Sequence, residues 1–310
     1  MNKPLLLGDA EVRIAAFDWL RRKVEALGDV LPRGMLAEGF DIRGQRIPLL
    51  GPQGIFKPKV LATVPLSITT APSGPYDDSF GEDGLVAYKY RGTDQNHRDN
   101  VGLREAMRRQ TPITYFHGVI PGRYLATWPV FVVSDDPKAL TFKIAVDDAS
   151  RAERAAEEAA QDRRAVTEDP APRRAYITAV VRQRLHQRAF RERVLEAYRA
   201  ECALCCLRHR ELLEAAHIIP DGEPGGETIV KNGIALCSLH HAAFDHFLIG
   251  IRPDYSVEVC SAILREQDGP MLRHGLQGLQ GGRLTVPRDP ASRPSPELLA
   301  RRWERFRATA

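Results

Sequence analysis

Four residues of metal-binding types occur as two short pairs that lie far apart in the sequence. Two residues separate the ligands within each pair, which is the spacing typical of tetrahedral structural zinc sites. An ion bound in this way joins two distant parts of the chain and requires a compact domain around it. The sequence therefore predicts a structural Zn²⁺ site formed by Cys202, Cys205, Cys237 and His240.

The remaining cysteines argue against a disulfide framework. The chain has five cysteines, and three of them fall within residues 202–206; an odd, clustered set is unusual for disulfide-stapled proteins. Cys206 competes with Cys205 as a ligand, but only Cys205 keeps the two-residue gap to Cys202. Cys260 lies in a segment typical of a strand, so we expect it in the core.

Length and hydropathy bound the class of protein. A chain of 310 residues is typical of two domains. No uncharged apolar run is long enough to span a bilayer, and the apolar stretch at the N-terminus is too short for an export signal. We therefore expect a cytoplasmic protein that does not interact with a membrane.

The first half of the chain is predicted to be rich in strands. Residues 9–27 form the exception, because apolar residues recur there at helical spacing after Asp9, which can cap the helix. Short β-rich runs alternate with Gly and Pro in residues 30–75 and recur in residues 84–92 and 112–147. A short helix is expected over residues 100–109.

A break in composition predicts the domain boundary. Residues 149–166 are polar and helix-forming without an apolar stripe, and two prolines follow within residues 168–174. An amphipathic helix is expected over residues 175–199, and a proline-rich loop precedes a last short helix at the C-terminus. The predicted organisation is an N-terminal domain, a helical or flexible linker and a C-terminal domain, at residues 1–148, 149–174 and 175–310.

A second constellation surrounds the predicted zinc ligands. His217 ends a predicted strand in EAAHI, and Asn232, His241 and Asp245 follow in NGIALCSLHHAAFD. Taken singly, these would be a core histidine, a turn and a pair on a helix surface. In this order and spacing, residues 195–250 resemble the HNH, or ββα-metal, endonuclease family, with the nuclease module at residues 202–245.

The resemblance implies a division of roles in phosphodiester hydrolysis. His217 would be the general base, since a neutral imidazole titrates near physiological pH. Asn232 would hold the loop and, through it, the orientation of His217. His241 and Asp245 lie four residues apart on a predicted helix, so both face the same way and would hold one Mg²⁺ or Mn²⁺.

One position departs from the pattern of many family members, which carry a further metal ligand directly before the base. Here that position is Ala216. Either the metal is bound more weakly, or another group such as Glu214 assists. The departure leaves open the identity of the metal and the alternative of an impaired enzyme.

Arginine is dense just before the cysteines, although the formal net charge of the whole chain is only +4. Such a run is either the solvated face of a helix or a set of phosphate contacts, and the neighbouring nuclease motif favours the second interpretation. The predicted phosphate contacts are Arg182, Arg184, Arg188 and Arg191.

An acidic and aromatic segment, SGPYDDSFGEDGLVAYKYRG, occupies residues 73–92. By composition alone it would be an acidic loop leading into a strand. Together with NHRDNVGLREAM after it, the segment resembles the SRA (or YDG) domain over about residues 45–145. Domains of this kind flip a modified cytosine out of the duplex and hold it between aromatic faces. The resemblance implies a pocket formed by Tyr76, Asp77, Asp78, Tyr88 and Tyr90.

The two resemblances together predict an α+β protein. An SRA-like domain with a curved sheet or β-barrel and helices would precede a ββα-metal HNH domain with structural zinc. HNH modules contact mainly the DNA backbone, so the N-terminal domain would supply specificity. The expected function is that of a modification-dependent restriction endonuclease acting on double-stranded DNA with modified cytosine. A homodimer would suit a double-strand cut by a nuclease with one site per chain.

Two alternatives remain open at this point. The chain could be an HNH nuclease whose N-terminal domain recognises another feature of DNA or binds a protein. It could also be a zinc-containing DNA-binding protein with a degenerate nuclease site.

Overall fold

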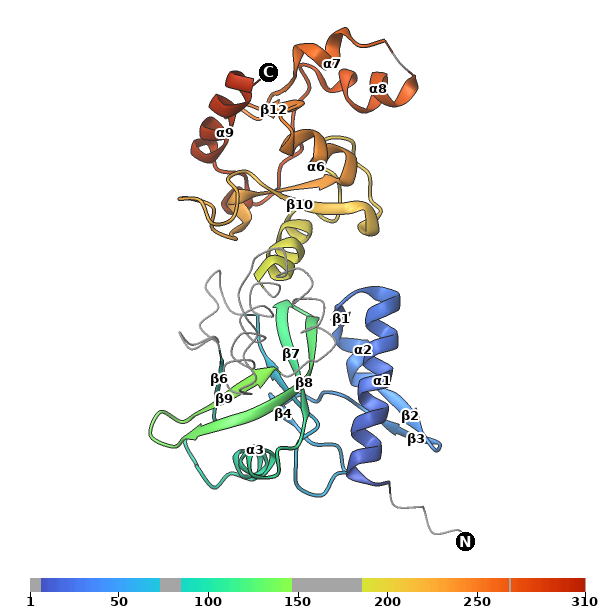
Figure 1. Ribbon diagram of the computed structural model, residues 1–310, viewed down its shortest axis with the longest axis vertical. Coiled ribbons are helices and arrows are strands. Elements are labelled where there is room, and N and C mark those ends of the chain that lie inside the picture. Colours follow the sequence, from blue (N-terminus) through green and yellow to red (C-terminus); the bar gives the residue numbers. More distant parts are fainter. Residues whose placement is uncertain (1–6, 73–84, 147–185, 268, 310) are drawn as a thin grey trace, which may run out of the picture. The chain divides into compact units, whose positions relative to one another are not determined.

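The computed structural model divides the chain into two compact units, residues 1–185 and 186–310, which are described separately (Figure 1). The predicted linker, residues 149–174, lies outside the described part of the chain, so its boundaries remain a prediction. The structure describes residues 7–72, 85–146, 186–267 and 269–309.

The N-terminal unit is built on a seven-stranded sheet of order β4-β5-β7-β8-β9-β6, with β1 paired to β8. All pairings are antiparallel except that of β5 with β7. The strands are β1 (Val30–Pro32), β4 (Ile55–Phe56), β5 (Ser67–Thr70), β6 (Val86–Lys89), β7 (Ile113–Ile120), β8 (Arg123–Asp136) and β9 (Thr141–Val146).

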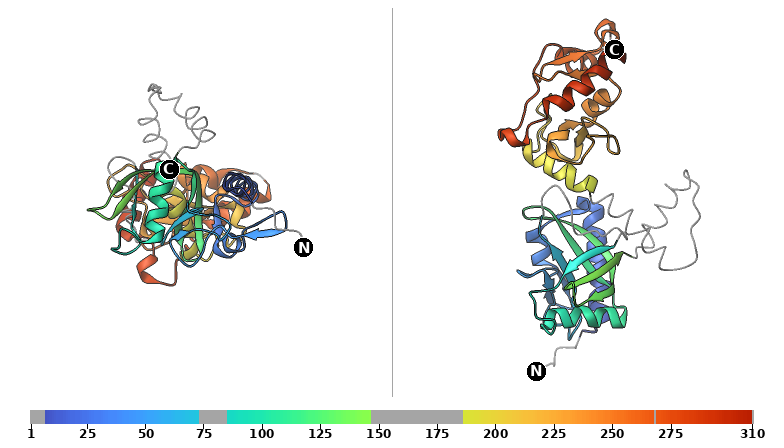
Figure 2. Two further views of the ribbon diagram at one scale, coloured as in Figure 1. Left: turned by 90° about the horizontal axis from the view of Figure 1, so that it is seen from below. Right: turned by 90° about the vertical axis from the view of Figure 1, so that its left-hand side faces the viewer.

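The sheet curls into a half-barrel, as the right-hand view of Figure 2 shows. Strands β7, β8 and β9 lie between β5 and β6 in the order of the sheet. The Tyr88 hydroxyl on β6 nevertheless donates to the Thr69 carbonyl on β5, at 3.2 Å. This contact requires the two outer parts of the sheet to bend toward each other, as strand twist and bulges allow. The mixed α+β character and curved sheet expected from the sequence are confirmed.

Helix α1 (Asp9–Leu27) has the predicted bounds. Val12, Ala16 and Leu20 are fully buried, as their spacing predicts. The predicted cap is wrong: Gly8 is the N-cap residue and no side chain caps it. Asp9 is instead the first helical residue, and its carboxylate accepts a 2.6 Å hydrogen bond from Arg13. The unit is completed by α2 (Arg33–Glu38), α3 (Arg98–Arg109), β2 (Phe40–Ile42) and β3 (Gln45–Ile47).

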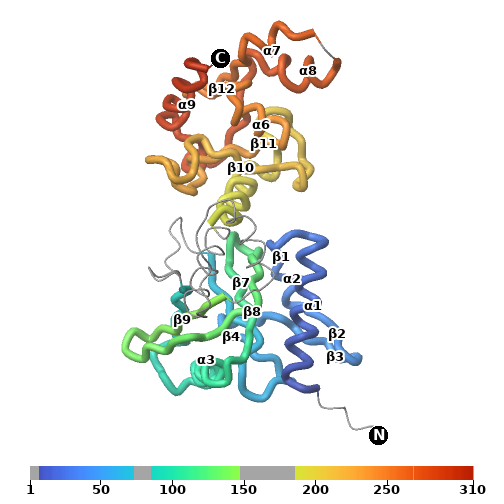
Figure 3. Tube along the Cα trace, viewed as in Figure 1, coloured from blue at the N-terminus to red at the C-terminus, as the bar shows by residue number. Residues whose placement is uncertain are grey.

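The C-terminal unit begins with a helix whose described part covers residues 186–197. A hairpin of β10 (Leu213–His217) and β11 (Gly233–Cys237) leads directly into α6 (Ser238–Asp245), as Figure 3 traces. The unit also contains η1 (Arg210–Leu212), η2 (Val230–Asn232), β12 (Ile249–Ile251), β13 (Val257–Val259), α7 (Ser261–Arg265), α8 (Pro270–Gly275), η3 (Gln277–Leu279), η4 (Pro290–Ser292) and α9 (Pro296–Thr309).

The core of this unit joins elements from both of its ends. Phe190 on the first helix, Phe244 on α6 and Phe306 on α9 are buried in one hydrophobic cluster. Cys260 also lies in this cluster, at 5 % exposure, so its expected burial is confirmed. Its expected place in a strand is wrong, because it is the N-cap residue of α7. None of the helices in the described ranges combines the length and apolar character needed to cross a membrane.

Candidate active site

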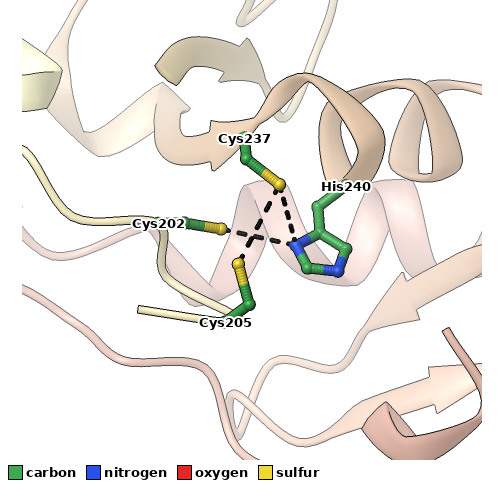
Figure 4. Close-up of side chains that lie close together, drawn as sticks. All are labelled: Cys202, Cys205, Cys237 and His240. Carbon is green, nitrogen blue, oxygen red and sulfur yellow. Dashed lines mark hydrogen bonds between the residues drawn. The ribbon is translucent and has the colours of Figure 1, made fainter. Parts of the chain in front are cut away.

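Four potential ligand atoms gather where the turn after Tyr198 meets the start of α6 (Figure 4). The Sγ atoms of Cys202, Cys205 and Cys237 and a ring nitrogen of His240 all lie within 4.8 Å of one another. The Cys205 and Cys237 sulfurs are 3.9 Å apart. His240 Nδ1 lies 3.4 Å from the Cys202 sulfur and 3.3 Å from that of Cys237.

These separations suit a single tetrahedral zinc ion. Zn–S bonds of about 2.3 Å and a Zn–N bond of about 2.0 Å place tetrahedral ligands roughly 3.5–3.8 Å apart. His240 Nε2 lies 2.8 Å from the Gly275 carbonyl, so Nε2 is the protonated nitrogen and Nδ1 is left with a free lone pair. Cys206 is exposed, has a left-handed backbone with φ of 61° and is not in this group. The group could therefore hold a structural zinc ion.

His217 is the last residue of β10, where the hairpin opens. Its ring stacks on Phe190, with centroids 4.1 Å apart and an interplanar angle of 20°. Burial, the largest influence, lowers the pKa of His217 from its ordinary 6.5, so the ring is neutral at physiological pH. Its Nε2 atom is buried and has no hydrogen-bond partner among the described residues.

The close approach of Phe190 depends on Gly233, which pairs with His217 across the hairpin. A Cβ atom at Gly233 would lie 2.8 Å from the Phe190 ring and 2.4 Å from Val194. Gly233 has an extended backbone rather than a left-handed one. The close packing against Phe190 and Val194 therefore explains why a glycine follows Asn232. A turn, the interpretation of Asn232-Gly233 taken in isolation, does not explain it.

Asn232 is completely buried and bridges the two ends of the hairpin loop. Its Oδ1 accepts from the Ile219 amide at 2.9 Å, and its Nδ2 donates to the carbonyls of Ile219 and Glu227 at 3.0 and 3.1 Å. The Ile218 amide also donates to the Asn232 carbonyl, at 2.9 Å. These four bonds hold the chain immediately after His217.

His241 lies between two carboxylates. Its Nδ1 contacts Glu214, and its Nε2 lies 3.2 Å from an Asp245 oxygen. Hydrogen bonding to Asp245, assisted by Glu214, raises the pKa of His241, while its own hydrogen bond lowers the pKa of each carboxyl. Glu214 lies on β10 and His241 on α6, so the contact also ties the hairpin to the helix.

A cavity of about 410 Å³ brings three of the predicted residues, His217, His241 and Asp245, together. Asn232 does not line the cavity, because its side chain is buried and bonds to Ile219 and Glu227 in the hairpin loop. Asp221, Arg302 and Arg305 were not expected from the sequence, since they come from the hairpin loop and from α9. The lining residues are His217, Pro220, Asp221, His241, Asp245, Phe247, Arg302 and Arg305.

Two of the predicted phosphate-contacting arginines, Arg182 and Arg184, lie outside the described residues. Arg188 is exposed. Arg191 is half-buried and donates to the carbonyls of Arg210 and Leu213 at 2.9 and 2.8 Å. These bonds tie the first helix to η1 and to the start of β10, and the phosphate contacts stay a prediction.

The predicted base pocket is described only in part, because Tyr76, Asp77 and Asp78 lie outside the described residues. Tyr88 and Tyr90 are each 7 % exposed. Tyr90 stacks on Phe142 with centroids 4.6 Å apart, and its hydroxyl contacts Asp135. Both tyrosines are thus held within the N-terminal unit, and a flipped base could stack on them only at a face left uncovered by these contacts.

The chain is similar at low sequence identity to two solved structures of restriction endonucleases. Among curated proteins, no sequence matches the chain. One similar solved structure is titled "Modification dependent TagI restriction endonuclease"; it is 15 % identical, with a TM-score of 0.29, over 77 % of this chain and 81 % of that chain. Another is the "Type IV phosphorothioation-dependent restriction endonuclease ScoMcrA", 16 % identical with a TM-score of 0.22 over 80 % of this chain and 51 % of that chain.

The family model described as HNH endonuclease matches residues 202–252. The match includes the zinc-ligand group, β11, α6 and the residues His217, His241 and Asp245 around the cavity. Residues 202–252 are therefore an HNH endonuclease domain, which makes the chain a metal-dependent DNA endonuclease.

Proposed function

We propose that this chain is a modification-dependent, restriction-type endonuclease that cleaves double-stranded DNA containing modified cytosine. The observation that carries the nuclease half of the proposal is the single cavity shared by His217, His241 and Asp245 at the end of the β10–β11 hairpin. A base and a cation-binding pair on one cavity are what phosphodiester hydrolysis requires.

His217 is assigned as the general base. Its pKa is lowered by burial, so a neutral ring nitrogen can take a proton from the attacking water at physiological pH. Stacking on Phe190 fixes the plane of the ring. The Asn232 hydrogen bonds to Ile219 fix the backbone that follows it, and we assign Asn232 as a positioning residue.

His241 and Asp245 are assigned as ligands of a catalytic Mg²⁺ or Mn²⁺. The 3.2 Å between His241 Nε2 and the Asp245 oxygen suits neighbouring ligands of an octahedral ion, which lie roughly 3 Å apart for bonds of about 2.1 Å. When bound, the ion would stabilise negative charge that develops on the phosphate oxygens. Glu214 contacts the other ring nitrogen, so we assign it to the orientation of His241 and not to the ligand position left by Ala216.

The four-residue group of Cys202, Cys205, Cys237 and His240 is assigned to a structural Zn²⁺. It joins the turn before β10 to the start of α6 and so supports the helix that carries His241 and Asp245. Zinc would therefore stabilise the site without taking part in the reaction.

Recognition is assigned to the N-terminal unit as an SRA-like reader. Tyr76, with Tyr88 or Tyr90, would stack on a flipped modified cytosine, and Asp77 or Asp78 would accept from its amino group. The curled half-barrel sheet is compatible with such a reader. Because Ala216 supplies no metal ligand, the cleavage assay also tests the alternative that the sequence left open, a zinc-containing DNA-binding protein with a degenerate nuclease site.

A cleavage assay separates these functions. Matched duplexes carrying cytosine, 5-methylcytosine or 5-hydroxymethylcytosine are incubated with the full chain and Mg²⁺ or Mn²⁺. Cleavage of the modified duplexes alone supports both assignments. Equal cleavage of all three duplexes supports the nuclease assignment and contradicts the assignment of the N-terminal unit as a modified-cytosine reader. Binding without cleavage under either metal supports the degenerate-site alternative.

A further inference from the structure

The cavity receives one buried cation from outside the HNH match. Arg302 lies on α9, well after residue 252, and is 6 % exposed. Its guanidinium carbon lies 4.0 Å from the centroid of the Phe244 ring and 4.9 Å from that of Phe247. These two rings cover the planar group and restrict its motion.

The guanidinium of Arg302 bonds to both halves of the site. Nη1 donates to the Ile218 carbonyl at 3.2 Å, and Ile218 directly follows His217. Nη2 donates to the Phe244 carbonyl at 2.7 Å and to Asp245 Oδ1 at 3.3 Å. A single rigid fork thus spans from the backbone beside the proposed base to the proposed metal-binding carboxylate.

The helix that carries Arg302 is itself anchored on both sides of it. Leu299 and Phe306 are buried in the core, at 0 % and 2 % exposure. Arg305 forms bonds of 2.6 and 3.2 Å to the two Glu223 oxygens in the hairpin loop. These contacts fix α9 against the loop after His217, so the position of Arg302 is set by the fold.

We propose that Arg302 is a positioning residue of the HNH site. It orients the Asp245 carboxylate and holds it in register with the backbone beside His217. This role rests on the proposed function, because it takes its meaning from the assignment of Asp245 as a metal ligand. Because Arg302 donates to Oδ1 of Asp245, the other oxygen of that carboxylate, Oδ2, is left directed at His241 Nε2.

The charge of Arg302 allows positioning to be distinguished from a plain electrostatic effect. A cation next to a metal site repels the metal, so removing the charge alone would tighten metal binding. Loss of positioning has the opposite sign, since a carboxylate ligand that loses its outer hydrogen bond binds metal more weakly. A purely structural role would lower the melting temperature and leave the metal affinity of the folded protein unchanged.

The test is a Mn²⁺ titration of the full, zinc-loaded chain by calorimetry, below the melting temperature of every variant. Arg302→Gln removes the charge and the fork, whereas Arg302→Lys keeps the charge and removes the fork. Arg307→Gln is the matched control, because Arg307 is an exposed residue of the same helix. An Asp245→Asn variant identifies the Mn²⁺ that is bound at this site.

Both Arg302 variants are expected to weaken the Asp245-dependent Mn²⁺ affinity by about tenfold or more, with no change in Arg307→Gln. Unchanged or tighter binding in Arg302→Gln would overturn the positioning role while leaving the nuclease assignment intact. Wild-type protein without any Asp245-dependent Mn²⁺ binding would overturn the catalytic metal assignment and this role together. Arg302→Lys keeps the test decisive if Arg302→Gln does not fold.

Discussion

Asn232 shows how a buried amide contributes to a site whose cavity it does not reach. Its side chain is completely buried and makes three hydrogen bonds across the hairpin loop. Replacing it by alanine leaves the Ile219 amide buried without this partner. Leaving a buried group unpaired costs about 1–3 kcal/mol. In its proposed positioning role, Asn232 would therefore link the stability of the loop to the orientation of His217.

We predict that Asn232→Ala lowers the free energy of unfolding of the C-terminal unit by about 1–3 kcal/mol. It should also slow DNA cleavage under conditions in which the protein is fully folded. Urea unfolding and cleavage rates, measured on the same preparation, check both effects. An unchanged free energy of unfolding together with an unchanged cleavage rate would contradict the positioning role of Asn232.

The protonation of His217 determines how cleavage should depend on pH. Its folded pKa is depressed, so the neutral form persists below pH 6.5, the ordinary histidine value, and is lost as the pH falls through the folded pKa. A bound cation nearby shifts the pKa in the same direction. At saturating Mn²⁺, the cleavage rate should therefore fall on acidification with a midpoint below pH 6.5. A midpoint above pH 6.5 would contradict the assignment of His217 as the general base.

The proposed zinc group connects two elements, the turn before β10 and the N-terminus of α6. Structural zinc sites supply much of the folding free energy of small domains. We predict that the Cys237→Ser variant loses bound zinc and that the melting temperature of its C-terminal unit is clearly lower. Cys206→Ser should keep both zinc and melting temperature, because Cys206 is exposed and outside the group. Metal analysis and calorimetry provide the readouts, and equal behaviour of the two variants would contradict the ligand assignment.

Local elements were predictable because their signals are local. The spacing of Val12, Ala16 and Leu20 predicts α1, and the EAAHI run predicts the strand that ends at His217. Long-range contacts leave no such signal in one sequence. Nothing near Arg302 indicates that it reaches Ile218, and nothing near β5 indicates its parallel pairing with β7. The Asp9 cap is wrong because Asp9 is already the first helical residue and Gly8 is the N-cap residue.

In the whole molecule, recognition and cleavage are assigned to different units. HNH chemistry acts on the phosphate backbone, which carries no direct sequence information. Under the proposed function, the N-terminal unit supplies the preference for modified DNA. The two activities should respond independently to substitution, because they are assigned to different units.

We predict that Tyr76→Ala and Asp78→Ala abolish the preference for modified duplexes and leave zinc content and melting of the C-terminal unit unchanged. Loss of base stacking is expected to weaken binding to modified DNA by about 1–3 kcal/mol. Competition binding between modified and unmodified duplexes measures the preference directly. A preference that survives both substitutions would place recognition elsewhere in the chain.

The assignment of His217 as the general base is tested most sharply by the cleavage rate of His217→Ala beside the wild type, on the duplex that the wild type cuts best. We predict that the variant binds this DNA and retains zinc like the wild type, but that its cleavage rate falls by at least about 10²-fold, since general-base catalysis contributes typically 10²–10⁴-fold. A variant that cuts at the wild-type rate would contradict the assignment of the active site to the cavity at the end of β10.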